Sequence, residues 1–124
     1  LMRGDRCACR GDYLEKFMQP AILKILFREP HHGFYILNKL SETSVFEGTS
    51  PDPTGMYRTL KKMEETGLLK SEWDTENSSQ PRRIYSITDE GRECLKAWVA
   101  TLESYSRKIS ELSKEISELF NSEI

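Results

Sequence analysis

The sequence predicts a mainly α-helical fold that carries a small β-hairpin and ends in one long helix. Two strand-like runs, at residues 68–73 and 82–87, flank a polar loop, which is the pattern of a hairpin. In the last third of the chain, apolar residues recur at alternating spacings of three and four, which is typical of a long amphipathic helix. At 124 residues and 14.4 kDa, the chain fits one domain with one element extending from it.

Two helices are expected in the first part of the chain. Residues 13–29 are apolar on more than one face, as in a helix that the rest of a small domain surrounds. Pro20 should begin or kink this helix, and Pro30 closes it. Residues 31–33, His-His-Gly, are expected to form a turn between helices, and residues 34–42 then place apolar side chains at helical spacing.

A third helix is expected between Asp52 and Gly67. Asp52 is a good N-cap, Pro53 suits the first helical position, and Gly67 suits the C-terminal end. One side of this helix carries an apolar stripe for the core. The opposite side is polar and basic and holds Thr54, Arg58, Lys61 and Lys62.

The hairpin and the last helix follow. The second strand opens with Arg82 and Arg83, and the loop at residues 74–81 is rich in turn-forming residues. Thr88 is the expected cap of the last helix, where Asp89 and Glu90 favour the positive end of the helix dipole.

The last helix predicts a homodimer. Its apolar residues form an unbroken heptad seam, made of Leu95, Trp98, Leu102, Tyr105, Ile109, Leu112, Ile116 and Leu119. A helix from Thr88 to Phe120 would extend roughly 50 Å, and the remaining residues are too few to cover that length. The seam is therefore expected to pack against a second copy of the chain, because an uncovered amphipathic helix is only marginally stable in water.

Charge and composition narrow the classes of function. The formal net charge is −2, but residues 1–88 carry +1 and residues 89–124 carry −3, which permits a basic DNA-binding surface on the first part without showing one. No apolar run approaches the roughly 18 residues that span a bilayer, so no membrane partner is expected. With no secretory signal and an odd number of cysteines, the expected location is the cytoplasm, with reduced thiols.

The order of helix, helix, basic helix and hairpin is that of a winged helix-turn-helix. Five segments in matching order and spacing also resemble the PadR-like family of bacterial transcriptional regulators, namely residues 22–26, 32–36, 55–64, 67–73 and 82–91. The resemblance covers roughly residues 20–100, and the single long last helix resembles the branch of the family with a short C-terminus. It implies a dimeric cytoplasmic regulator, usually a repressor, that a small molecule often releases from its operator.

These observations divide the chain into three parts. Residues 1–12 are expected to be an N-terminal arm, residues 13–88 a winged helix-turn-helix domain that binds double-stranded DNA, and residues 89–124 a dimerisation helix. The alternative function is a winged-helix module that binds a partner protein. Only DNA binding should weaken steeply as salt rises. An enzyme is not expected, because the sequence has no nucleophile elbow, phosphate loop or paired-carboxylate motif.

A DNA-reading helix offers cations to phosphates and a few side chains to base edges in the major groove. Thr54 and Arg58, near the start of the basic helix, are the candidates for base contact. The candidates for backbone contact are Tyr57, Lys61 and Lys62 on the helix, and Lys70, Arg82 and Arg83 on the wing. Residues 51–55 depart from the family pattern, because they are proline-rich and include an acid, which leaves the contacts of the first turn open.

Each of these residues also has a structural interpretation. The basic face could simply be solvated, Tyr57 could be a partly buried aromatic, and the two wing arginines could guard an edge strand against aggregation. Trp98 is either a large core residue or a surface on which a flat apolar ligand stacks, as the resemblance suggests. In the second case Tyr105 and Phe17 would complete a site for a small aromatic effector.

Cys7 and Cys9 are the remaining chemical motif. Both thiols could reach a soft metal or form a redox pair, but a zinc site would need two more ligands. No metal or other cofactor is therefore expected. The competing interpretation of this segment is a basic arm that touches DNA, because the segment also carries Arg3, Arg6 and Arg10.

Overall fold

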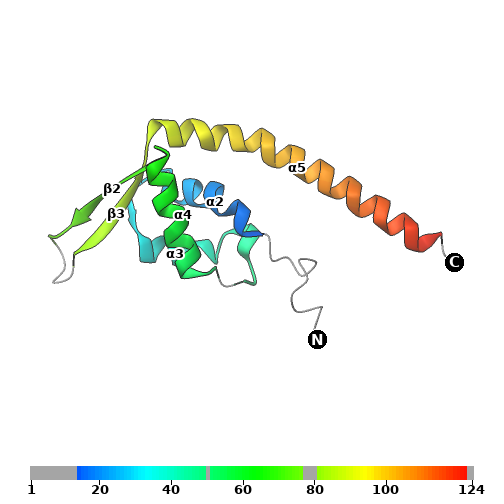
Figure 1. The fold of residues 1–124 in the computed structure, drawn as a ribbon, viewed down its shortest axis with the longest axis horizontal. Coiled ribbons are helices and arrows are strands. Elements are labelled where there is room, and N and C mark those ends of the chain that lie inside the picture. Colours follow the sequence, from blue (N-terminus) through cyan, green and yellow to red (C-terminus); the bar gives the residue numbers. More distant parts are fainter. Residues whose placement is uncertain (1–13, 50, 77–80, 123–124) are drawn as a thin grey trace.

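The computed structural model of the chain describes residues 14–49, 51–76 and 81–122. Within these ranges helices and a small sheet surround one core, and the last helix projects far beyond it (Figure 1). In chain order the elements are η2 (Leu14–Phe17), α2 (Met18–Leu26), β1 (His31–His32), α3 (Gly33–Leu40), η3 (Ser44–Phe46), α4 (Pro53–Glu65), β2 (Leu69–Asp74), β3 (Arg82–Ile87) and α5 (Asp89–Asn121).

The sheet has three antiparallel strands in the order β1-β3-β2. The hairpin predicted from the sequence is confirmed, and β1 adds a third strand in which His31 pairs with Tyr85 and His32 with Ile84. The expected turn at residues 31–33 is therefore wrong at its first two positions. A strand of two residues is too short to show an alternating pattern, so the sequence carries no sign of it.

The helices bury one shared core against the sheet. The buried side chains come from α2, α3, η3, α4 and the hairpin, and they are Met18, Ala21, Ile22, Leu23, Leu26, Ile36, Leu40, Phe46, Met56, Leu60, Met63, Leu69, Tyr85 and Ile87. This arrangement of helices and a three-stranded sheet is the predicted winged helix-turn-helix, in which α3 and α4 are the paired helices and the β2–β3 hairpin is the wing.

Two helix boundaries differ from the prediction. The first helix begins as a 3-10 turn, has Pro20 in the first turn of α2, and ends at Leu26 rather than at residue 29. Pro30 disfavours the helical conformation at Glu29, which explains why the helix does not include residue 29. α3 begins one residue earlier than expected, at Gly33, and ends at Leu40.

Both ends of α4 are fixed as the sequence predicts. The Asp52 carboxylate accepts a hydrogen bond from the backbone N–H of Gly55 at 3.0 Å, which caps the first turn. At the other end Gly67 has a φ of +85°, and the N–H of Leu68 donates to the carbonyl of Met63 at 2.9 Å. These features form a glycine-dependent C-cap, which turns the chain directly into β2.

Thr88 joins the start of α5 to the end of α4. Its hydroxyl accepts from the N–H of Gly91 at 3.0 Å and donates to the carbonyl of Gly67 at 2.6 Å. Leu95 and Trp98, on the first turns of α5, pack against the core of the same chain. Beyond them α5 leaves the domain, and the described residues offer its far half no cover (Figure 1).

Candidate nucleic-acid interface

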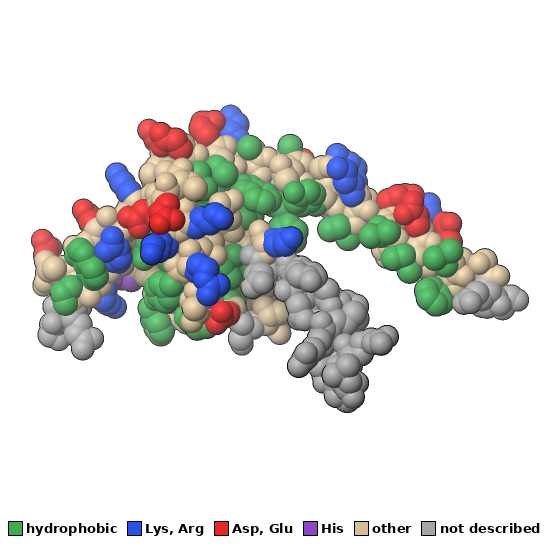
Figure 2. Space-filling model, viewed as in Figure 1, with side chains coloured by type: hydrophobic (Ala, Val, Ile, Leu, Met, Phe, Trp, Pro, Cys, Tyr) green, Lys and Arg blue, Asp and Glu red, His purple; other side chains and the backbone are tan. Residues whose placement is uncertain are grey.

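The outer face of α4 is exposed and basic. One side of the helix faces the core, where Met56, Leu60 and Met63 are completely buried. The opposite side carries Thr54, Arg58, Lys61 and Lys62, all four of which are exposed. In Figure 2, Lys and Arg side chains gather over the region of α4, on the face turned to the viewer. The structure thus places the four predicted helix residues together on one solvent-facing surface.

Tyr57 lies at the edge of this face and is 45% exposed. Its ring packs against the start of α3, because a Cβ added to Gly33 would lie only 2.6 Å from Cε1 of the tyrosine. The ring is thereby held in place without being covered. Tyr57 is therefore partly packed and partly available to a ligand, which leaves its expected contact with phosphate open.

The two wing arginines point to opposite sides of the sheet. In the β2–β3 register, Trp73 lies opposite Arg83 and Lys70 lies opposite Ser86, so alternation puts Arg83 and Trp73 on one face. Lys70 and Arg82 share the other face. The sequence groups Arg82 with Arg83 as neighbours, but the strand separates them.

Arg83 connects the wing to α4. Its Nε donates to Oγ of Ser71 at 3.0 Å, and that hydroxyl donates to Oε2 of Glu64 at 2.7 Å. The guanidinium also lies 3.9 Å from the same carboxylate and 4.8 Å from the ring centre of Trp73. These contacts fix the face of the wing that is turned toward the helix. Sequence reasoning missed Glu64, Ser71 and Trp73, because their partners are distant in the chain.

Tyr85 lies beneath this network. Burial raises the pKa of its hydroxyl above the ordinary value of 10.0, the Arg83 charge lowers it, and Glu64 and Tyr57 raise it further. The net shift is upward, so Tyr85 stays neutral at physiological pH. Tyr85 is therefore a packed, uncharged side chain beneath the network.

A second side-chain contact joins the wing to β1. Nε2 of His32 lies 3.0 Å from Oδ2 of Asp74, which ties β1 to the end of β2. Within the part of the chain that the structure describes, no group of three His, Cys, Asp or Glu side chains could hold a metal ion. Cys7 and Cys9 lie outside the described residues.

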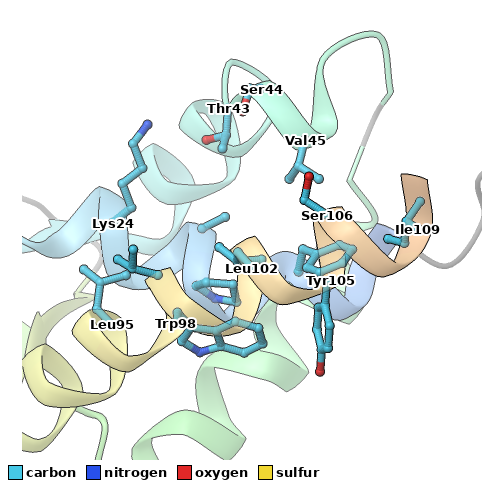
Figure 3. Close-up of a pocket in the computed structure, with 14 residues that line it drawn as sticks. Lys24, Thr43, Ser44, Val45, Leu95, Trp98, Leu102, Tyr105, Ser106 and Ile109 are labelled. Carbon is cyan, nitrogen blue, oxygen red and sulfur yellow. The ribbon is translucent and has the colours of Figure 1, made fainter. Parts of the chain in front are cut away.

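A separate apolar groove runs between α5, α2 and η3 (Figure 3). It has a volume of about 430 Å³ and brings together the three residues named for an effector site. Trp98 and Tyr105 lie along one side of α5, and the ring of Tyr105 meets that of Phe17 edge to face, with centroids 6.2 Å apart. Polar side chains in the lining are those of Lys24, Thr43, Ser44 and Ser106.

The seam runs along this groove and continues past it, and it carries large exposed side chains. They are Leu102, Tyr105, Ile109, Leu112, Ile116 and Leu119, whose exposure runs from 38% to 65%. In Figure 2 hydrophobic side chains follow the lower edge of α5 almost to its end. Leu95 and Trp98 differ from the rest of the seam, because their own domain already partly covers them.

Comparison with known proteins decides the family. A family model described as "Transcriptional regulator PadR-like family" matches residues 22–97. The chain belongs to the PadR-like family of transcriptional regulators. The family is one of regulators rather than enzymes, and the resemblance seen in the sequence is confirmed. Among curated protein sequences, none matches the chain.

Solved PadR-family structures share the fold. A regulator from Eggerthella lenta has 26% identity and a TM-score of 0.74, with 90% of this chain and 96% of that one covered. A regulator from Clostridium difficile has 27% identity and a TM-score of 0.65, with 77% and 97% covered. Bacillus subtilis PadR, solved in complex with operator DNA, has 22% identity and a TM-score of 0.57, with 65% and 45% covered. In the described ranges of this PadR-like chain, no helix is both long and apolar enough to cross a membrane.

Proposed function

We propose that this PadR-like regulator binds a two-fold-related DNA site as a homodimer, and that it acts as a repressor in the cytoplasm. The observation that carries the proposal is the exposed basic face of α4 beside the wing. The Bacillus subtilis relative was solved with operator DNA and has the same fold, which supports DNA as the partner. In this proposal residues 13–88 bind DNA, residues 89–124 dimerise, and residues 1–12 add a basic arm.

The residues of the interface have different roles in this proposal. Thr54 and Arg58 reach base edges in the major groove, because they lie on the outer face near the N-terminus of α4. The backbone contacts come from Tyr57, Lys61 and Lys62 on α4 and from Lys70, Arg82 and Arg83 on the wing. Arg83 has a double role, since it also holds the wing against Glu64 through Ser71.

The dimer forms along the exposed part of α5. Along a helix of 33 residues, roughly 50 Å long, six large apolar side chains of the seam are 38% to 65% exposed. Burying apolar area of this kind contributes about 25 cal/mol per Å², which makes a second copy of the same seam the simplest cover. Leu95 and Trp98 stand at the inner end of this interface, where each domain meets its own helix.

A small, flat aromatic molecule is the proposed effector. The groove beside Trp98, Tyr105 and Phe17 is apolar and of a size that suits such a ligand. It also adjoins the proposed dimer seam, so a bound ligand would contact both the domain and α5. Release from DNA follows if the ligand favours an angle between the two subunits that the operator does not accept.

Fluorescence anisotropy with a labelled duplex from upstream of the chain's own gene tests DNA binding. We expect the wild type to prefer this duplex over a scrambled one, and Arg58→Ala or Lys61→Ala to weaken binding. A variant that makes one phosphate contact fewer should show a slope of log K against log salt that is shallower by about 0.9. Lys114→Ala, which removes the same charge at an exposed position of α5, is the matched control. No preference for the upstream duplex, or equal binding by the variants, would overturn the proposal.

A winged-helix module that binds a partner protein is the second candidate. The exposed aromatic rings of Phe34 and Trp73 favour it, because large exposed apolar surfaces often mark protein interfaces. The same anisotropy experiment separates the two candidates. Binding of DNA that falls steeply from 50 to 200 mM salt supports the regulator, and no DNA binding at any salt supports the module.

A further inference from the structure

A cleft rich in aromatic side chains lies between the start of α3, α4 and the wing. We call it the aromatic cleft. It has a volume of about 330 Å³, and its lining includes Phe34, Tyr57, Trp73, Arg82 and Arg83. Phe34 is 64% exposed and Trp73 is 60% exposed, although both are large and apolar. Figure 2 shows hydrophobic side chains near the outer end of the wing, close to basic ones. Such a patch marks a binding surface.

The chemistry of the aromatic cleft favours a ligand that is both anionic and partly apolar. The Arg83 guanidinium lies over the Trp73 ring at 4.8 Å, and its side chain is 39% exposed. Its Nε is used by Ser71, which orients the guanidinium. The flat ring can pack against an apolar face of a ligand, while the guanidinium fixed above the ring donates to an anion next to that face.

The position of the aromatic cleft suggests which ligand this is. If α4 lies in a major groove and the wing reaches the adjacent minor groove, the DNA strand between the two grooves must cross the space between α4 and the wing. The aromatic cleft lies there, continuous with Tyr57 at the edge of the basic face. A sugar–phosphate strand offers an apolar deoxyribose face next to an anionic phosphate.

We propose that the aromatic cleft binds the sugar–phosphate backbone of duplex DNA. Trp73 packs against a deoxyribose, and Arg83 donates to the neighbouring phosphate. The inference rests on the proposed function, and it adds to it a contact at Trp73 that does not depend on charge. The cations of the cleft and its continuity with α4 favour a polyanion over a protein as the occupant.

The fluorescence of Trp73 tests the contact directly. The chain has two tryptophans, so Trp98→Phe leaves Trp73 as the single indole. Any 30-base-pair duplex that the protein binds at low salt can be used, because every duplex has the same backbone. We expect the Trp73 emission to change with the same midpoint as the anisotropy of the labelled duplex. The reverse variant, Trp73→Phe, leaves only Trp98, whose emission should not follow the DNA titration.

Affinity gives a second, independent readout. We expect Trp73→Ala to raise the dissociation constant roughly fivefold to tenfold, while Trp73→Phe recovers most of the affinity because it keeps a ring. The slope of log K against log salt should be the same for Trp73→Ala as for the wild type, because no phosphate contact is removed directly. Lys61→Ala, which removes a proposed phosphate contact, should make that slope shallower by about 0.9, and this separates the two kinds of contact.

The outcomes are distinguishable from those of the proposed function. A change in Trp73 emission on binding, together with a salt-independent fall in the affinity of Trp73→Ala, supports the inference. DNA binding with unchanged Trp73 emission and unchanged affinity of Trp73→Ala overturns the inference and leaves the proposed function standing. If the wild type binds no duplex at all, the proposed function is wrong and the inference falls with it.

Discussion

The Nε of Arg83 donates to Oγ of Ser71 at 3.0 Å, on the face of the wing that is turned toward α4. The hydroxyl in turn donates to Glu64 at 2.7 Å, so one serine joins both strands of the wing to the neighbouring helix. Because Arg83 is 3.9 Å from the Glu64 carboxylate, it reaches that group less closely than the serine does. The orientation of the wing therefore depends on a neutral side chain between two charged ones.

Replacing this serine tests that dependence. We expect Ser71→Ala to lower the free energy of unfolding by about 1 kcal/mol, because the variant cannot form two partly buried hydrogen bonds. DNA affinity should fall as well, since Arg83 is no longer held in a fixed orientation. Chemical denaturation and anisotropy measure the two effects. Ser86→Ala, on the opposite face of β3, is the matched control and should change neither quantity. Equal behaviour of the two variants would contradict this account.

A substitution at Gly33 tests whether Tyr57 contributes to DNA affinity without a large change in the stability of the domain. A Cβ at this position would lie 2.6 Å from Cε1 of Tyr57, which is the far end of a movable side chain. We expect Gly33→Ala to shift the ring while leaving the free energy of unfolding within about 1 kcal/mol of the wild type, because alanine also favours the helix. DNA affinity should fall to the level of Tyr57→Ala. If affinity is unchanged, Tyr57 does not contact DNA.

Gly91 presents the opposite case. A Cβ there would meet the backbone carbonyl of Leu68 and would lie 2.8 Å from Cγ1 of Ile87, and a backbone carbonyl cannot move aside as a side chain can. We expect Gly91→Ala to cost roughly 1–3 kcal/mol in the free energy of unfolding, as overpacking does. Thermal or urea denaturation measures it. Glu90→Ala, one residue away and exposed, should cost much less.

The seam of α5 can be tested by adding charge to it. We expect Leu112→Glu to convert a homodimer into a folded monomer at micromolar concentration, because a carboxylate would be buried on each side of the interface. Sedimentation velocity measures the mass, and circular dichroism shows whether the helix persists. Ser110→Glu adds the same charge off the seam and should remain dimeric. A wild type that sediments as a stable monomer would contradict the dimer itself.

The raised pKa of Tyr85 predicts that the stability of the protein falls at alkaline pH. Its pKa is raised in the folded protein, so the folded state holds the phenolic proton more tightly than the unfolded chain does. The resulting stability is complete below pH 10 and is lost as the pH rises through the raised pKa. We expect the free energy of unfolding of the wild type to fall more steeply above pH 10 than that of Tyr85→Phe. Parallel curves from pH 8 to 11 would show that Tyr85 has no such effect.

The elements with strong local signals could be predicted from the sequence. α4 is bounded by an aspartate cap and a glycine that requires a positive φ, and both act within a few residues of the chain. α5 has an acidic first turn and a long apolar repeat. β1 could not be predicted, because its two residues are held by a partner strand more than fifty positions away.

The same distinction applies to the site. Periodicity placed Arg58 and Lys61 on the exposed side of α4, since the opposite stripe had to be buried. The network of Glu64, Ser71 and Arg83 depends on how the wing packs against the helix, and no spacing in the sequence encodes it. The heptad pattern predicts which residues lie on the seam of α5, but not which of them their own domain covers. Leu95 packs on its own domain and Leu112 does not, and only the structure distinguishes them.

Thr88 has a mechanical consequence. Its hydroxyl joins the first turn of α5 to the turn that ends α4, which restricts rotation of one helix relative to the other at this point. Because α5 is roughly 50 Å long, a change of a few degrees in the angle between the two helices corresponds to a displacement of several ångströms at its far end. In the proposed dimer, this angle would set the separation of the two α4 helices. The distance between DNA half-sites that the dimer accepts would then depend on the angle that Thr88 fixes.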